Sequence, residues 1–157
     1  MQPTATLPYR QNVCMILFND QKQILLGERF RQAGIWQFPQ GGVEAEYSLE
    51  ENVYRELEEE LGLCRPAVEI IKQLEATHRY EWEIPPSHFV NRFIGQEQTF
   101  WLVRVSDASK INLVSEEQEF QQVRWLEPHV VLAAVEPVRI KGYQPPLEEV
   151  IRYLSSL

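Results

Sequence analysis

The segment GGVEAEYSLEENVYRELEEELGL, residues 41–63, decides the fold because it specifies one helix together with both of its ends. Ser48, followed three residues later by Glu51, is the capping-box pattern that begins a helix. Gly62 stands where a helix commonly ends, because glycine readily adopts the left-handed conformation found after the last turn. The sequence therefore predicts a helix that begins at Ser48 and ends just before Gly62.

The last two turns of this helix carry four glutamates, Glu56, Glu58, Glu59 and Glu60. The helix macrodipole is already negative at this end, so four carboxylates there oppose folding. At about 100° per residue, Glu56, Glu59 and Glu60 share a flank that borders the apolar stripe, whereas Glu58 points elsewhere. Hard oxygen ligands gathered at the edge of a core suit Mg²⁺ or Mn²⁺. We therefore expect a divalent cation on this flank.

A run of glutamates is more commonly a solvated helix face, and the residues before the helix argue against that alternative. The run WQFPQGG, residues 36–42, is apolar at first and is stopped by Pro39 and two glycines. This pattern is typical of a short strand followed by a tight loop. Strand, loop and doubly capped helix together favour the metal site.

Residues 41–63 resemble the Nudix box, which in words is Gly, five residues, Glu, seven residues, Arg-Glu, an aliphatic residue, any residue, Glu-Glu, any residue, Gly and an aliphatic residue. The matching positions are Gly41, Arg55, Glu56, Leu57, Glu59, Glu60, Gly62 and Leu63. Fixed spacing over this length makes the signal specific. The resemblance implies an α/β fold, a Nudix-type α/β/α sandwich around a mixed β-sheet, and a pyrophosphohydrolase that acts on acid anhydrides.

One element of the box differs, because Tyr47 stands where the family has glutamate. In the family that glutamate usually braces the loop against the helix, often by pairing with the box arginine, here Arg55. Glu44 or Glu46 can supply a carboxylate if the loop shifts, or the Tyr47 hydroxyl can accept a hydrogen bond from Arg55. We expect an intact metal triad and an altered brace. The alternative is a nucleotide-binding module with weakened or lost turnover.

Short motifs outside the box resemble the branch that contains bacterial RNA pyrophosphohydrolases and asymmetric dinucleoside tetraphosphate hydrolases. They are Tyr9-Arg10-x-Asn12-Val13, the run at 36–42, Tyr80 with Ile84-Pro85, Gly95-Gln96-x-Gln98, and Glu119-Phe120 followed by Arg124-Trp125. The resemblance implies Mg²⁺-dependent hydrolysis of a phosphoanhydride in a nucleotide polyphosphate, either the 5′ end of an RNA or a dinucleoside polyphosphate. Nucleotide sugars and nucleoside triphosphates remain alternative substrates, because the branches that use them share the box.

The same resemblance assigns roles to individual residues. The metal site comprises Glu56, Glu59, Glu60, Glu119 and Gly41, and its four glutamates are also the catalytic residues. Structural support comes from Arg55, Tyr47, Gly42 and Gly62. More than one Mg²⁺ is expected, with Mn²⁺ as an alternative. The substrate-binding residues are Arg10 and Arg29 for phosphate, Lys141 in a basic motif, Tyr80 for stacking a base, and Gln40 and Gln98 for orienting phosphate or water. The alternatives are a solvated loop acid for Glu119, a surface position for each arginine, a core or lid position for Tyr80, and solvation at the sheet edge for the two glutamines.

The whole chain of 157 residues has the length of one domain, 1–157. Its net charge of −8 argues against an extended nucleic-acid surface. No apolar run reaches the length of a membrane span and the first residues do not resemble a signal peptide, so we expect no membrane partner and a cytoplasmic protein. Further strands are predicted at 12–18, 23–29, 68–76, 99–105 and 121–126, helices at 128–135 and 146–157, and a functional loop or lid at 78–98.

Overall fold

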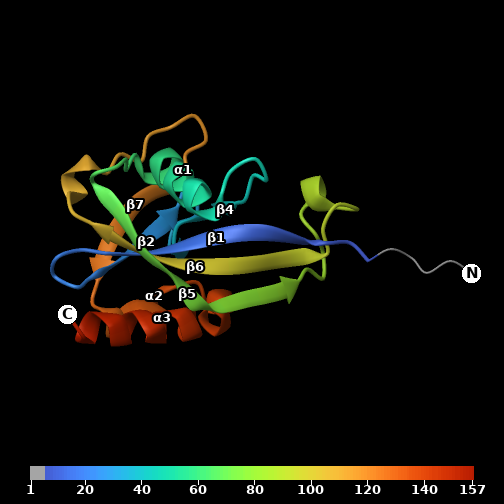
Figure 1. Ribbon diagram of the computed structural model, residues 1–157. Coiled ribbons are helices and arrows are strands. Elements are labelled where there is room, and N and C mark those ends of the chain that lie inside the picture. The colour runs from blue at the N-terminus through green and yellow to red at the C-terminus, as the bar shows by residue number, and fades with distance from the viewer. Residues whose placement is uncertain (1–5) are drawn as a thin grey trace, which may run out of the picture.

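A computed structural model describes residues 6–157, in which one mixed sheet is the central layer (Figure 1). The strands of this described part are β1 (Tyr9–Phe18), β2 (Ile24–Arg29), β3 (Trp36–Gln37), β4 (Gln40–Gly42), β5 (Val68–Glu81), β6 (Gly95–Val105) and β7 (Phe120–Leu126). The order is β3-β2-β1-β6-β5, while β4 also pairs with β1 and β7 with β2. Only β1 and β6 run parallel among these pairs, so the sheet is mixed as predicted.

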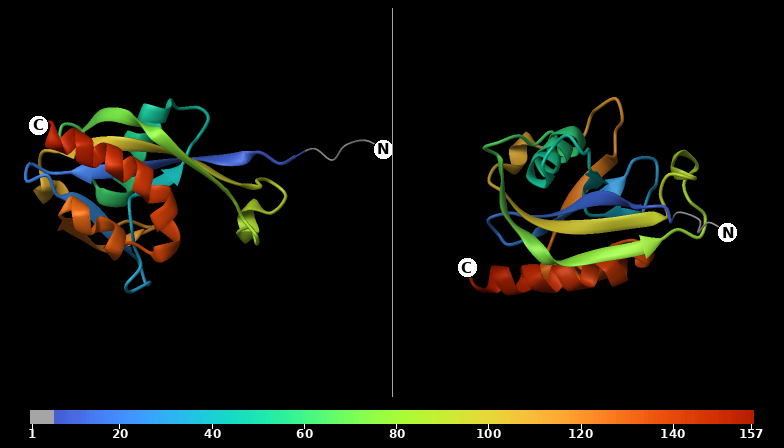
Figure 2. Two further views of the ribbon diagram at one scale, coloured as in Figure 1. Left: turned by 90° about the horizontal axis from the view of Figure 1, so that it is seen from below. Right: turned by 45° about the vertical axis from the view of Figure 1, so that its right-hand side comes forward.

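Helices cover both faces of the sheet. Helix α1 (Leu49–Leu61) lies on one face, and α2 (Val131–Ala134) and α3 (Ile140–Ser155) lie on the other (Figures 1 and 2). Within residues 6–157, 3₁₀ turns occupy Ser87–Phe89, Ala108–Lys110, Pro128–Val130 and Pro137–Arg139. The predicted α/β/α sandwich is confirmed. None of the helices in residues 6–157 has both the length and the hydropathy needed to cross a bilayer.

Strand β1 is buried on both sides and separates two cores. Val13, Met15 and Leu17 belong to the core that packs under α1, together with Val53 and Leu57. Their neighbours Cys14, Ile16 and Phe18 belong to the core under α3. Because successive strand residues point to opposite faces, a central strand covered twice must be apolar throughout. The apolar run at 13–18 is therefore the centre of the molecule.

Both ends of α1 have the predicted caps. Ser48 Oγ accepts a hydrogen bond from the Glu51 amide at 3.1 Å, and the Glu51 carboxylate accepts one from the Ser48 amide at 3.2 Å. Gly62 adopts the left-handed conformation with φ of +67°, and its amide donates to the Glu58 carbonyl at 2.9 Å. Local signals alone thus fix the helix that carries the glutamates.

The predicted loop at 78–98 is wrong at both ends. Strand β5 continues to Glu81 and β6 begins at Gly95, so only residues 82–94 lie outside the ladder. His78 pairs with Gln98, and Glu81 with Gly95. These paired segments are polar and have no apolar alternation, because their end of the hairpin extends beyond the helices (Figure 1). Backbone pairing with a neighbouring strand decided the structure there.

Helix α3 begins at Ile140, before the predicted start at 146. Pro145 and Pro146 lie inside the helix, although each lacks the amide that an interior position normally donates. Tyr143 holds the first turn against the core, where it is 1% exposed and its hydroxyl accepts a hydrogen bond from the Phe38 amide at 3.2 Å. Tertiary packing therefore outweighs the proline signal. On the same helix Leu147, Val150 and Leu154 are buried, whereas Ile151 is exposed.

Candidate active site

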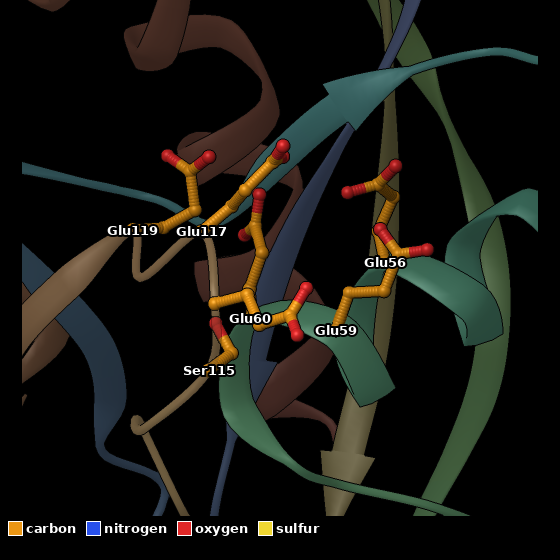
Figure 3. A pocket seen from close by; sticks show the side chains of 7 residues that line it. Glu56, Glu59, Glu60, Ser115, Glu117 and Glu119 are labelled. Carbon is orange, nitrogen blue, oxygen red and sulfur yellow. The ribbon is translucent and has the colours of Figure 1, made fainter.

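An acidic cavity of about 370 Å³ lies between the C-terminal half of α1 and the segment that leads into β7 (Figure 3). Its lining consists of Glu56, Glu59, Glu60, Ser115, Glu116, Glu117 and Glu119. The pairing of β7 with β2 positions the second group, because the Phe30 amide donates to the Glu119 carbonyl at 2.8 Å. Carboxylates from two distant segments therefore share one cavity, in which Glu119 lies with the helix glutamates.

Burial makes two of these carboxylates costly to ionise. Glu56 and Glu60 are 8% and 6% exposed, whereas Glu59 has an exposed side chain. Desolvation, reinforced by the charge of Glu59, raises the pKa of Glu56 to about 7. Desolvation and the charge of Glu56 raise the pKa of Glu60 well above its usual value. Burial also raises the pKa of Glu119, which lines the same cavity.

The donor set fits a divalent cation. Glu60 Oε2 is buried and has no hydrogen-bond partner in the described structure. An unpaired buried carboxylate oxygen is expensive, and a cation supplies the missing partner. No three His, Cys, Asp or Glu side chains among residues 6–157 are arranged to hold an ion as they stand. Binding therefore requires side-chain adjustment, which the exposed Glu59 carboxylate can make.

Gly41 lies against the Glu56 carboxyl group. A Cβ placed on Gly41 would overlap the Cδ and Oε2 atoms of Glu56. Strand β4 brings Gly41 there by pairing it with Val13 of β1. Only glycine lets the backbone approach the carboxylate this closely, which explains why the box begins with glycine.

We expect Gly41→Ala to fold, because the end of the Glu56 side chain can move away from the added methyl group. We also expect turnover to fall about tenfold or more, because this movement displaces the Glu56 carboxylate. Thermal unfolding and steady-state kinetics measure the two effects. In a Glu56→Gln background the same change should cost little further activity. Equal losses in both backgrounds would show that Gly41 acts independently of Glu56.

Arg55 has its partners on the loop and on its own helix. Its Nη1 lies 3.4 Å from Glu44 and 3.2 Å from Glu59. Its Nη2 donates to Asn52 Oδ1 at 2.7 Å. The Tyr47 ring, not its hydroxyl, faces the guanidinium, with 5.4 Å from Cζ to the ring centroid. Of the substitutes considered from the sequence, Glu44 makes the contact; Asn52 was missed because it reads as an ordinary helix position.

Two arginines flank the acidic cavity. Arg10 lies over Gly42, where a Cβ would overlap its guanidinium, and donates to Gln96 Oε1 at 2.8 Å. Its charge lowers the pKa of Glu56 against the effect of burial. Arg29 acts in the same direction on the pKa of Glu119. The surface alternative does not describe Arg10, which is partly buried; its ring contact is with Phe89 of the 82–94 segment, at 4.7 Å.

Three of the four remaining predicted substrate residues line a second cavity, also of about 370 Å³. Its lining includes Tyr80, Gln98 and Lys141, together with His78, Arg139 and Tyr143, which the sequence did not single out. Gln98 is buried, not solvated at a sheet edge, and donates to Gln40 Oε1 at 2.8 Å and Asn12 Oδ1 at 3.1 Å. The Tyr80 hydroxyl accepts a hydrogen bond from the Gln96 side-chain amide, and the Tyr80 ring lies beside His78. Gln40 thus links this cavity to Glu60, because a hydrogen bond from the Gln40 backbone partly opposes the rise in the pKa of Glu60.

Comparisons with known proteins show the family to which this chain belongs. A NUDIX domain model matches residues 8–145. The RNA pyrophosphohydrolase of Saccharophagus degradans is 36% identical to this chain, and the match covers 90% of this chain and 85% of the relative. The RNA pyrophosphohydrolase of Roseobacter denitrificans is 34% identical, and the match covers 88% of this chain and 89% of the relative. Among solved structures, a NUDIX hydrolase from Listeria monocytogenes superposes with a TM-score of 0.72 at 23% identity, covering 95% of each chain. An Ap4A hydrolase from C. elegans superposes with a TM-score of 0.66 at 15% sequence identity, covering 93% of this chain and 99% of that one. The two structures support the fold alone.

Proposed function

The chain belongs to the NUDIX family of hydrolases that act on acid anhydrides, and on this premise we propose that it hydrolyses a phosphoanhydride bond in the 5′-triphosphate of RNA. The observation that carries this proposal is the acidic cavity with Arg10 and Arg29 at its sides. Relatives named RNA pyrophosphohydrolase match along most of this chain's length, which makes RNA 5′ ends the first candidate substrate.

Electrostatics explains why the reaction needs a metal. The cavity is lined by six glutamates, and a polyphosphate is itself strongly negative. Without cations the two repel one another. The Nudix family uses divalent metal ions, and we assign Mg²⁺, in more than one copy, to Glu56, Glu59, Glu60 and Glu119 with Gly41 beside them. When bound, Mg²⁺ screens the phosphate oxygens and stabilises charge on the leaving group.

The protein's own groups position the substrate and move the proton. Arg10 and Arg29 meet phosphate oxygens that the cations leave unpaired, because a guanidinium binds phosphate through paired hydrogen bonds. A carboxylate of the cavity accepts the proton of the attacking water, and Glu119 is suited to this role because it stands apart from the helix triad.

The second cavity supports a nucleoside next to the phosphates. Tyr80 and His78 offer ring surfaces there, and Lys141 adds a positive charge. Stacking on aromatic rings tolerates any base. A substrate whose phosphates reach the acidic cavity can therefore place a base against these rings, which both an RNA end and a dinucleoside tetraphosphate can do.

A product analysis tests the proposal. With Mg²⁺ present, we expect the chain to convert a 5′-triphosphorylated oligoribonucleotide to its 5′-monophosphate at a higher kcat/KM than it cleaves diadenosine tetraphosphate, a nucleoside diphosphate sugar or a deoxynucleoside triphosphate. Separation of the labelled products gives the rates. A clear preference for the sugar nucleotide would overturn the substrate assignment, and failure on every substrate would overturn the function.

A further inference from the structure

Asn52 is a polar side chain completely buried in the first turn of α1. It is 0% exposed. Its Nδ2 donates to three backbone carbonyls, those of Glu44 at 3.2 Å, Tyr47 at 3.3 Å and Ser48 at 2.9 Å. Its Oδ1 accepts from the Glu44 amide at 2.9 Å. One side chain therefore holds both ends of the loop between β4 and α1.

The fifth hydrogen bond of Asn52 connects it, through Arg55, to the proposed metal site. Asn52 Oδ1 also accepts from Arg55 Nη2 at 2.7 Å, the shortest of its hydrogen bonds. The other guanidinium nitrogen, Nη1, lies 3.2 Å from Glu59 and 3.6 Å from Glu56. A single arginine thus joins the loop brace to two of the proposed ligands. The orientation of Arg55, and through it the position of both carboxylates, depends on Asn52.

Tyr47 occupies the place of the missing glutamate without replacing its charge. The ring is 40% exposed and lies over the Arg55 guanidinium. A cation–π contact at a partly exposed site is weaker and less directional than a carboxylate–guanidinium pair. Tyr47 shields Arg55 from solvent but does not fix its orientation. The groups that do so are Asn52 and, more weakly, Glu44 at 3.4 Å.

We propose that Asn52 is a positioning residue that takes over the role of the absent box glutamate: it ties the 44–48 loop to α1 and orients Arg55 toward Glu56 and Glu59. The site is then competent despite Tyr47, and the weakened binding module is not the native state of this chain. The inference rests on the proposed function for its meaning, but its contacts are independent of any substrate.

The test combines two substitutions in one cycle. Asn52→Ala removes the brace, and Tyr47→Glu restores the carboxylate that the family uses. We expect Asn52→Ala to weaken Mn²⁺ binding about tenfold or more, as loss of an outer-shell partner does. We expect Tyr47→Glu to change it less than twofold in the native background and to recover most of the loss in the Asn52→Ala background. Electron paramagnetic resonance of free Mn²⁺ measures binding without turnover.

Ser48→Ala is the matched control. It breaks the capping box, so it lowers thermal stability at the same end of the helix, but it leaves the Arg55 contacts in place. Its Mn²⁺ affinity should equal that of the native chain. If Ser48→Ala weakens Mn²⁺ binding as much as Asn52→Ala does, the effect is general destabilisation and the proposal is wrong. It is equally wrong if Tyr47→Glu strengthens binding by the same factor in both backgrounds.

Arg55→Lys covers the case in which Asn52→Ala fails to fold. Lysine keeps the charge and opens no cavity, but its single ammonium cannot hold Asn52 and Glu59 in the fork geometry of arginine. We expect about tenfold weaker Mn²⁺ binding, and unchanged binding would overturn the proposal. If the native chain binds Mn²⁺ through this brace yet hydrolyses none of the substrates above, the proposed function fails and the brace stands.

Discussion

We expect Glu60→Gln to lower kcat/KM by about a thousandfold while raising the stability of the metal-free protein at pH 8. A metal ligand stabilises transition-state charge by several kcal/mol, and a loss of about 4 kcal/mol corresponds to a factor of about a thousand. Glutamine keeps the volume of the side chain but carries no charge. The penalty for ionising a buried carboxyl with a raised pKa therefore disappears from the folded state.

Glu58→Gln is the control for this prediction. It removes the same charge from the same helix, but Glu58 is exposed and does not line the acidic cavity. Its kcat/KM should stay within about twofold of the native value, since a solvated surface charge contributes little. Kinetics and thermal unfolding in EDTA, measured on both variants, separate the metal site from the general charge of α1. If Glu60→Gln retains more than a tenth of the activity, Glu60 is not a ligand.

The second large effect concerns pH and metal removal. The pKa of Glu56 is raised to about 7 in the folded protein, so the folded state binds its proton more tightly than the unfolded chain does. Between about pH 4.5 and pH 7 the unfolded carboxyl is ionised while the folded one still holds a proton. This group therefore makes the free energy of unfolding of the metal-free protein fall as pH rises through that window. The raised pKa of Glu60 acts in the same direction.

Mg²⁺ should reverse this pH dependence. At a concentration of one hundred times Kd, binding contributes about 2.7 kcal/mol, which for a domain of this size raises Tm by about 5–10 °C. Protons compete with the cation for the same carboxylates, so the increase should be largest near pH 8 and small near pH 5.5. Thermal unfolding with EDTA or Mg²⁺ across this range measures it. An increase that is the same at both pH values would place the cation away from Glu56 and Glu60.

Short-range signals in the sequence were sufficient for α1 and its carboxylates. The capping box, the terminal glycine and the angular spacing of Glu56, Glu59 and Glu60 all depend on residues within one or two helical turns of each other. Such local rules operate before any tertiary contact forms. The strand at 12–18 was also predictable from the sequence, because a strand covered on both faces has a continuous apolar run.

The pairing between strands that are distant in the sequence could not be predicted in the same way. The 78–98 segment was assigned to a loop because its residues lack periodicity, whereas β5 and β6 extend through part of it by pairing with each other. Gln98 could be assigned either to substrate or to solvent from the sequence, and only the adjacency of β1, β4 and β6 buries it beside Asn12 and Gln40. The register between strands, unlike a helix face, is set by contacts that local spacing does not encode.

The sequence by itself determined which carboxylates share a helix flank and where that helix begins and ends, since a 3.6-residue period and two caps fix both. Only the tertiary structure decided what those carboxylates meet: Glu119 brought beside them by the pairing of β2 with β7, Gly41 set against Glu56 by β4, and Asn52 buried where it holds the loop and Arg55. The physical reason is burial. Burial raises the pKa of the glutamates, and it directs the hydrogen bonds of Asn52 to the loop and to Arg55 instead of to water. This burial exists only once α1 has packed against the sheet.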